Sequence, residues 1–203
     1  MTKLASAATA TRDRILGAAF TLFGRYGFKR TSMEDIATEA GLSRSALYLQ
    51  FRNKEDIFRE LAAGLHEDGL TRAQTALDSD KPLAERLRGA VEAKTLGMIE
   101  IVYASAHGSE LMDEKNRLCG DLATDSERRF QEMLTQALVR AAESQEIDLG
   151  AAGLSASEAA DLLARSLNGL KGPEVTIDLY RKRVASLVNV FIRAWGPERT
   201  KVL

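Results

Sequence analysis

The residues between positions 31 and 54 include several side chains that can bind the edges and backbone of a nucleic acid. Arg44 can donate two hydrogen bonds to guanine O6 and N7, and Gln50 can pair with adenine. Leu49, if exposed, can contact a thymine methyl group, and the Tyr48 hydroxyl can reach a phosphate. Each residue type also has ordinary structural roles, so the argument for binding rests on their joint arrangement.

Hydroxyl and ammonium groups in the same stretch can contact phosphate oxygens. Thr31 and Ser32 are expected at the start of one helix and Lys54 at the start of another. Backbone N–H groups and the helix dipole favour an anion at such positions. The alternatives are that Thr31 only caps its helix and that Lys54 is simply solvated. Phosphate contacts position a protein on DNA, whereas contacts with base edges select a sequence.

Two short helices joined by a tight turn are predicted to position these side chains. Thr31 and Glu34 fit a capping box at the start of the first helix, and Ser43 fits the N-cap of the second. Gly41 supplies the backbone freedom that the turn requires. The expected core residues are Ile36, Ala37, Leu42, Leu47 and Phe51. This arrangement is a helix-turn-helix, whose second helix lies in the major groove of DNA.

The rest of the chain also shows apolar residues at helical spacing. Together with the two short helices, it predicts an all-α protein of about nine helices without a convincing strand. A short helix between 109 and 119 is left open. The other expected helices lie near residues 11–26, 53–77, 82–105, 121–144, 155–172 and 176–195.

The charge of the chain is unevenly distributed. Residues 1–54 contain nine Lys or Arg and four Asp or Glu, a net charge of +5, whereas the remainder carries 19 basic and 25 acidic residues. A basic amino-terminal part on an acidic remainder favours contact of the former with a polyanion, although chance segregation would give the same count.

The composition argues against several other classes of protein. With one cysteine, Cys119, the chain cannot form an internal disulfide, and it has neither an apolar run of membrane-spanning length nor a secretion signal. We therefore expect a cytoplasmic protein without membrane contact. No catalytic constellation or cofactor motif is present, so we predict that it is not an enzyme. The mixed cluster of His107, Glu110, Asp113, Glu114 and Cys119 matches no common zinc spacing, and no metal is expected.

Two segments resemble the TetR family of bacterial repressors. They are GLSRSALYLQFRNKEDIF, from Gly41 to Phe58, and ILGAAFTLFGRYGFKRTSMEDIATEAG, from Ile15 to Gly41. The DNA contacts of that family fall here on Ser32 or Met33 and on Arg44, Ser45, Ala46, Tyr48, Leu49, Gln50 and Lys54. Ser45 replaces a frequent glycine, and Leu49-Gln50 replaces a frequent aromatic or histidine pair, so the operator sequence stays open.

The amino-terminal sequence predicts a flexible tail over 1–9. The resemblance implies a DNA-binding domain over 10–70 and a helical ligand-binding and dimerisation domain over 71–203. The candidate pocket residues are Met98, Tyr103, His107, Met112, Phe130, Met133 and Leu134. The candidate dimer-interface residues are Leu163, Leu167, Leu170, Tyr180, Val184, Leu187, Val188 and Phe191. The interface residues are equally compatible with ordinary core, and for any single pocket residue ordinary core is the favoured interpretation. The aromatic fraction of 6% favours a small or aliphatic ligand.

The leading functional prediction is a ligand-responsive transcriptional repressor. A homodimer would bind a palindromic double-stranded operator and would be released by a small-molecule effector. The alternative is a DNA-binding activator or architectural protein without a small-molecule ligand.

Overall fold

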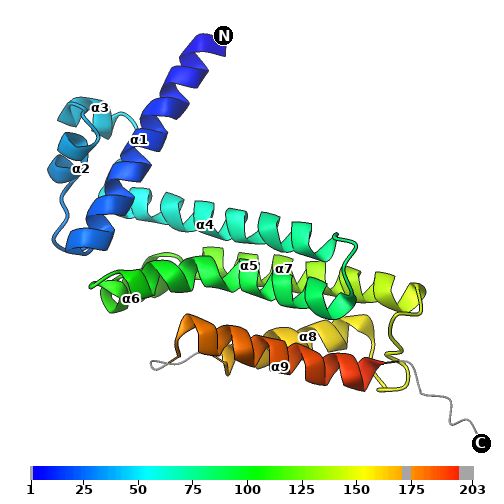
Figure 1. Cartoon of the computed structure of the whole chain (residues 1–203). Helices are drawn as coiled ribbons and strands as arrows, with labels where there is room; N and C mark the ends of the chain where they lie inside the picture. The colour runs from blue at the N-terminus through cyan, green and yellow to red at the C-terminus, as the bar shows by residue number, and fades with distance from the viewer. Residues whose placement is uncertain (1, 171–174, 197–203) are drawn as a thin grey trace, which may run out of the picture. The chain divides into compact units, whose positions relative to one another are not determined.

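The computed structural model describes residues 2–170 and 175–196, without the side chains of residues 2–8, 98 and 102–104. Within these residues it contains nine α-helices and no strand, which confirms the all-α fold (Figure 1). The helices are α1 (Thr2–Tyr26), α2 (Met33–Glu39), α3 (Arg44–Tyr48), α4 (Lys54–Leu77), α5 (Leu83–Ala104), α6 (Gly108–Leu118), α7 (Gly120–Glu143), α8 (Ala156–Asn168) and α9 (Ile177–Trp195).

The contacts of the chain divide it into two compact units. Unit 1 comprises Met1–His66 and Met98–Ala123, and unit 2 comprises Glu67–Gly97 and Thr124–Leu203. Unit 1 thus contains α6 and the end of α5 in addition to the amino-terminal helices, because these segments pack with α1 and α4. The predicted division at residue 70 stays a prediction.

The core of unit 1 contains the expected residues of the helix-turn-helix. Ile36 and Leu47 have no exposed surface, and Ala37 and Phe51 are 3% exposed. Leu42 is half-buried and packs against this cluster. Around it, the rings of Phe23, Phe28 and Phe58 lie with their centroids 5.2 to 5.7 Å apart. Truncating a fully buried leucine or isoleucine, such as Leu47 or Ile36, typically lowers the free energy of unfolding by about 2–5 kcal/mol. This cluster therefore holds the short helices α2 and α3 in place.

The capping box of α2 lies one residue later than predicted. Ser32, not Thr31, is the N-cap, and its reciprocal partner is Asp35, not Glu34. Thr31 is 3% exposed, and its hydroxyl donates to the Gly27 carbonyl over 2.8 Å. The prediction was wrong because both registers satisfy the local pattern, and only packing of Thr31 against the end of α1 distinguishes them. The bonds from Ser32 lower the pKa of Asp35.

Two helix boundaries also differ from the prediction. Helix α1 begins at Thr2, about nine residues before the expected start, and includes positions expected to form a tail. Alanines at positions 5, 7, 8 and 10 favour helix there. Helix α8 ends at Asn168 with Gly169 as its cap, so Leu170 lies in the following turn. The expected stop at Gly172-Pro173 lies outside the described residues.

In unit 2, helices α8 and α9 each bury one apolar face. Leu163 on α8 and Tyr180, Val184 and Trp195 on α9 are at most 1% exposed. The predicted capping box of Ser155 and Glu158 is confirmed at the start of α8. None of the described helices is apolar over a length that could cross a membrane.

Candidate nucleic-acid interface

Helix α3 presents the predicted base-reading side chains to solvent. Gly41, with φ 63°, forms the turn before it, and Ser43 caps it by accepting the Ala46 N–H over 3.2 Å. Since Leu47 is buried and anchors the helix, the opposite face is exposed. This face carries Arg44, Ser45, Tyr48 and Leu49, and Leu49 is 83% exposed.

A shallow surface depression brings together predicted contacts from three helices. It is lined by the start of α2, by α3 and by the start of α4. The predicted residues in its lining are Thr31, Ser32, Met33, Arg44, Tyr48 and Lys54. The Arg44 guanidinium carbon lies 5.6 Å from the centroid of the Tyr48 ring, close enough for a cation–π contact. Tyr48 thereby helps to orient Arg44 on this face.

Several of the predicted contacts are poorly accessible, and some lie outside this depression. Ala46 is half-buried, and Ser45 is exposed with its hydroxyl 3.0 Å from that of Ser43. Gln50 is half-buried, while Met33, which does line the depression, packs its side chain against the core. The Thr31 hydroxyl is buried and already donates a hydrogen bond, so it is poorly placed to donate to a phosphate.

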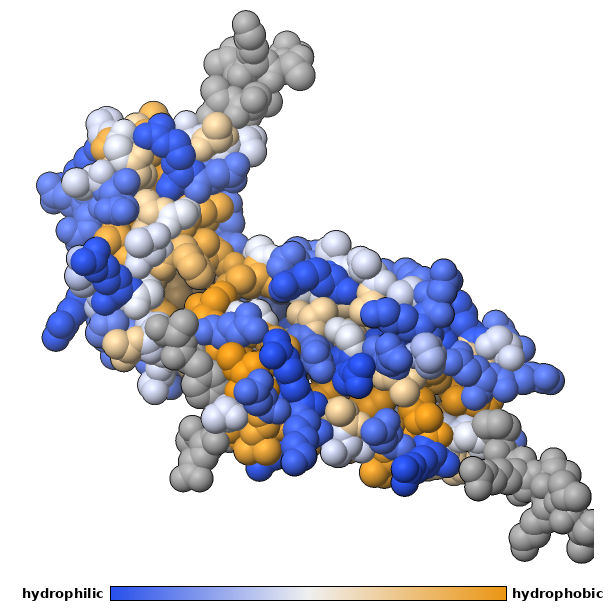
Figure 2. Space-filling view, viewed as in Figure 1, coloured by the Kyte–Doolittle hydropathy of each residue, from blue (hydrophilic) through white to orange (hydrophobic). Residues whose placement is uncertain are grey.

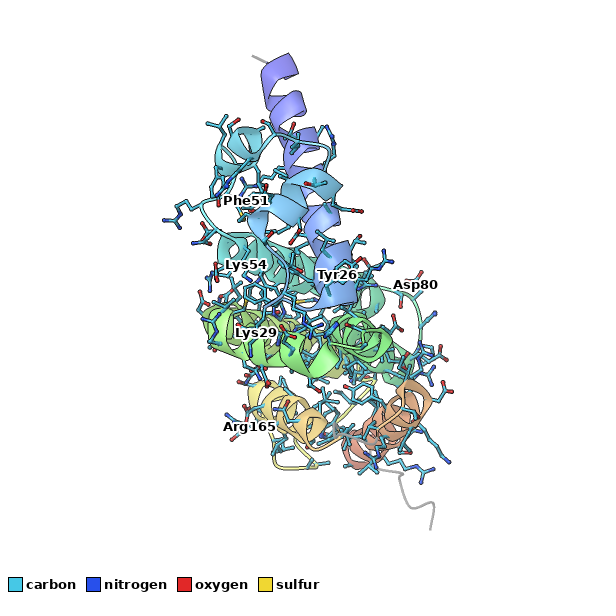
Figure 3. All side chains as sticks on the ribbon, turned by 90° about the vertical axis from the view of Figure 1, so that its left-hand side faces the viewer. Tyr26, Lys29, Phe51, Lys54, Asp80 and Arg165 are labelled. Carbon is cyan, nitrogen blue, oxygen red and sulfur yellow. The ribbon has the colours of Figure 1, made fainter. Side chains whose placement is uncertain are left out.

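Lys54 has internal partners for its ammonium group. Nζ donates to the carbonyls of Phe28, Lys29 and Thr31 over 2.8, 3.2 and 3.0 Å. It also lies 4.6 Å from the centroid of the Phe28 ring. Figure 3 shows Lys54 and Lys29 in this part of unit 1. An ammonium group has three N–H donors, so all of them are used in joining α4 to the loop before α2.

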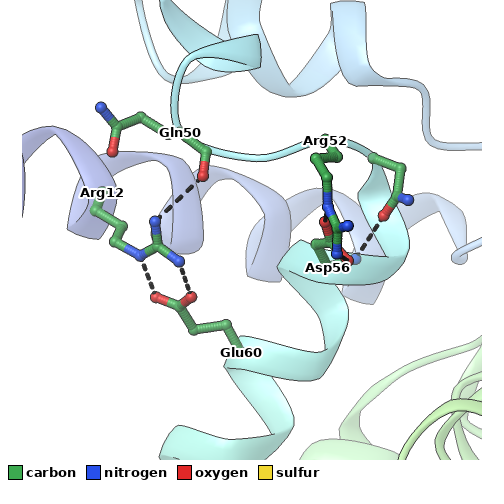
Figure 4. Close-up of polar contacts among 6 residues, drawn as sticks. Arg12, Gln50, Arg52, Asp56 and Glu60 are labelled. Atoms are coloured by element: carbon green, nitrogen blue, oxygen red, sulfur yellow. Dashed lines mark hydrogen bonds and ion pairs between the residues drawn. The ribbon is translucent and has the colours of Figure 1, made fainter.

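Arg12 forms a second internal contact, between residues far apart in the sequence. Its guanidinium pairs with both carboxylate oxygens of Glu60 and donates to the Gln50 carbonyl over 3.2 Å (Figure 4). It also stacks 4.2 Å from the centroid of the Phe51 ring. The hydrogen bond with Glu60 raises the pKa of Arg12. No local spacing signals this pair, because 48 residues separate its members.

These contacts refine the meaning of the basic charge in the first 54 residues. Arg14 donates to the Ala40 carbonyl over 2.5 Å, so Arg12, Arg14 and Lys54 all bind groups inside unit 1. Arg52 pairs with Asp56 at 2.9 Å, although its side chain remains 89% exposed. Fewer basic residues are therefore available to a polyanion than the net charge of residues 1–54 indicates. Arg44 is one of those that are available.

The turn between α5 and α6 binds α1, and the start of α6 binds the segment that precedes α2. The Ser105 hydroxyl donates to the Gly24 carbonyl of α1 over 2.8 Å. The Lys29 N–H donates to the Glu110 carboxylate of α6 over 2.7 Å. His107 Nδ1 lies 3.8 Å from the same carboxylate. These bonds connect α6 to the amino-terminal helices within unit 1.

Gly27 is the point at which this connection leaves least room for a side chain. Its φ is +85°, and an added Cβ would lie 2.6 Å from a carboxylate oxygen of Glu110. We expect Gly27→Ala to lower the free energy of unfolding by about 1–3 kcal/mol, from backbone strain and displacement of Glu110 from Lys29. Chemical denaturation measures this loss.

Gly17→Ala on α1 is the matched control for Gly27→Ala. A Cβ at Gly17 meets no atom within 4 Å, and its backbone is helical. This change should stabilise the protein by about 0.5–1 kcal/mol because alanine favours helix. Equal stability of the two variants would contradict the role assigned to Gly27.

The predicted ligand-pocket residues are divided between the two units. His107 and Met112 belong to unit 1, whereas Phe130, Met133 and Leu134 belong to unit 2. Phe130 lines a polar depression of unit 2 with residues of α8, and Leu134 has no exposed surface. The predicted side chains of Met98 and Tyr103 lie outside the described residues. The largely apolar cavity of unit 1 has a volume of about 420 Å³, and none of the five predicted residues whose side chains are described lines it.

The predicted interface residues are mostly buried within unit 2. Leu163, Tyr180 and Val184 have no exposed surface, and Leu167 and Val188 are also buried. Leu170, Leu187 and Phe191 are half-buried. The apolar residues that α8 and α9 expose most are not among the predicted ones: Leu162, Leu179 and Val190 are 44%, 37% and 65% exposed. They lie beside the buried stripes, where helical periodicity alone does not separate core from surface.

Residues 15–61 match a family model described as bacterial regulatory proteins, tetR family. The HTH-type transcriptional regulator TtgR of Pseudomonas putida is 41% identical over 75 residues, which are 36% of this chain and 36% of TtgR. The HTH-type transcriptional repressor KstR2 of Mycobacterium tuberculosis is 32% identical over 89 residues, 44% of each chain. The matches thus span less than half the length of these relatives.

Solved structures resemble a larger part of the chain. PfmR from Thermus thermophilus, a TetR family transcriptional regulator, has a TM-score of 0.61 and 25% identity, and the match covers 93% of this chain and 97% of PfmR. SmeT, the repressor of the Stenotrophomonas maltophilia multidrug efflux pump SmeDEF, has a TM-score of 0.66 and 23% identity, with coverage of 95% and 93%. The likeness to SmeT shows a shared fold.

Proposed function

We propose that the chain is a DNA-binding transcriptional repressor of the tetR type whose binding is controlled by a small molecule; the match of residues 15–61 to the tetR family model and the likeness to PfmR support this proposal. The observation that carries this proposal is the exposed face of α3, held on a buried core. Arg44 and Leu49 lie on that face, and Tyr48 lies against Arg44. Side chains of these types can read base edges in the major groove while phosphate contacts fix the orientation.

The proposed active form is a homodimer. The exposed apolar side chains on α8 and α9, namely Leu162, Leu179 and Val190, support an interface formed by the same surface of two copies. A two-fold dimer carries two reading helices and thus matches an operator with two related half-sites. Light scattering should give a mass of twice the 22.2 kDa chain. A monomer at micromolar concentration would refute the dimer.

The proposed effector acts by favouring a conformation that binds the operator poorly. A ligand shifts such an equilibrium only if it binds one conformation more tightly than the other. Operator fragments selected from random DNA provide the test of the proposal. We expect selection of a palindrome, with binding that weakens steeply as salt rises. Absence of any sequence preference would overturn the assignment of α3 as a reading helix.

A further inference from the structure

The cavity of unit 1 lies within the same compact unit as the helix-turn-helix. Its lining comes from α1, α4, the end of α5 and the first part of α6, and its volume is about 420 Å³. The apolar lining residues are Phe20, Phe23, Phe58, Leu61, Ala62, Leu65, Ile101 and Leu111. Hydrophobic residues, orange in Figure 2, reach the surface on the face shown there. A cavity of this size and lining suits a small molecule with an apolar body.

Three residues with polar side chains also line the cavity, and they differ in the availability of their polar groups. The Ser105 hydroxyl already donates to Gly24 and accepts the His107 N–H. Glu100 is exposed and is engaged in a contact of its own. Lys115 is half-buried, and its ammonium has no hydrogen-bonding or ion-pair partner among the described residues. Lys115 is therefore the group available to an anionic end of a ligand.

We propose that this cavity binds an amphipathic anion, an apolar molecule with one carboxylate, and that its occupation regulates DNA binding. The proposal rests on the function proposed above and specifies the class of its effector. The apolar walls would bury the body of the ligand, and Lys115 would bind the carboxylate. This position differs from the pocket predicted from the sequence, which included Phe130, Met133 and Leu134 of unit 2.

The cavity is adjacent to the contacts that hold the helix-turn-helix. Gly24 and Ser105 both line it and are joined to each other by a hydrogen bond. Leu111, also in the lining, follows Glu110, which binds the Lys29 N–H ahead of α2. A ligand between α1 and α6 would contact both sides of this connection. If the ligand fitted one arrangement of α1 and α6 better than another, its binding would favour that arrangement. The position of α2 and α3 would change with it.

Gly24→Leu tests the site by filling the cavity. A Cβ at Gly24 meets no atom within 4 Å, so the side chain can extend into the space without displacing backbone. Gly17→Leu is the matched control, since Gly17 lies on the same helix with equally open space and does not line the cavity. The probes are decanoic acid and 1-decanol, measured by displacement of a fluorescent naphthalene sulfonate from the DNA-free protein.

We expect decanoic acid to bind the native protein and Gly17→Leu equally, and to bind Gly24→Leu at least ten-fold more weakly. Equal binding to all three, or absence of binding to the native protein, would overturn the proposal. Lys115→Met provides a second test, which remains valid even if Gly24→Leu does not fold. It should remove the preference for decanoic acid over 1-decanol, and an unchanged preference would overturn the role of Lys115.

DNA release is measured separately so that the two proposals can fail independently. With an operator fragment, decanoic acid should weaken binding by the native protein at least five-fold and leave Gly24→Leu unaffected. Binding of the acid without any effect on DNA would overturn the regulatory role of the cavity but not the ligand site. Lack of operator recognition in the DNA-only experiment would instead overturn the proposed function.

Discussion

Replacing Arg44 with alanine should weaken binding to the selected operator by one to two orders of magnitude, about 1–3 kcal/mol. Arg44 is exposed on α3, and its guanidinium carbon lies 5.6 Å from the centroid of the Tyr48 ring. A bidentate bond to guanine is lost entirely on truncation. Titrations with fluorescently labelled operator, at constant salt, measure the change.

Two comparisons separate lost base recognition from lost charge. Arg165 is an exposed arginine of α8 in unit 2, and Arg165→Ala removes the same charge from a helix that is not expected to read DNA. It should leave operator affinity nearly unchanged. Arg44→Ala should also reduce discrimination at one base position of each half-site. If affinity falls equally for operator and random DNA, Arg44 contacts phosphate and not a base edge.

Replacing Lys54 with methionine should destabilise the protein by about 2–4 kcal/mol. Methionine retains much of the apolar stem but leaves the carbonyls of Phe28, Lys29 and Thr31 without the ammonium that binds them. The loop between α1 and α2 would lose its connection to the start of α4. Urea denaturation followed by circular dichroism would report the loss of stability.

Lys29→Met is a suitable control, because the Lys29 side chain is exposed in the same loop. It should change stability by less than about 0.5 kcal/mol. The dependence of DNA affinity on salt provides the second test for Lys54. If Lys54 bound phosphate, its loss would reduce the slope of log affinity against log salt by about 0.9. We expect folded Lys54→Met to keep the native slope, and a reduced slope would refute the structural role.

The helix-turn-helix was predictable in most respects because its signals are local. Gly41, Ser43, Leu47 and Phe51 occupy the expected positions, since turn conformation, helix capping and core spacing depend on neighbouring residues. The capping box of α2 shows the limit of such signals. Two overlapping patterns were locally equivalent, and burial of Thr31 selected the one that begins at Ser32.

The candidate ligand and dimer sites were much less predictable. Apolar residues at helical spacing indicate that a helix has a buried face, but not whether that face meets the same chain, a second chain or a ligand. Tyr180 and Val184 are fully buried core, whereas the neighbouring Val190 is 65% exposed. The cavity of unit 1 combines α1 with α6, which no local pattern could bring together.

The sequence by itself determined the helical fold, the helix-turn-helix and the residues of the exposed face of α3, because these follow from interactions among close neighbours. Only the tertiary structure decided which basic residues are available to DNA. Arg12 pairs with Glu60, and the ammonium of Lys54 binds carbonyls more than twenty residues away. A charge count cannot distinguish a free cation from one with an internal partner, because that difference depends on distances set by folding.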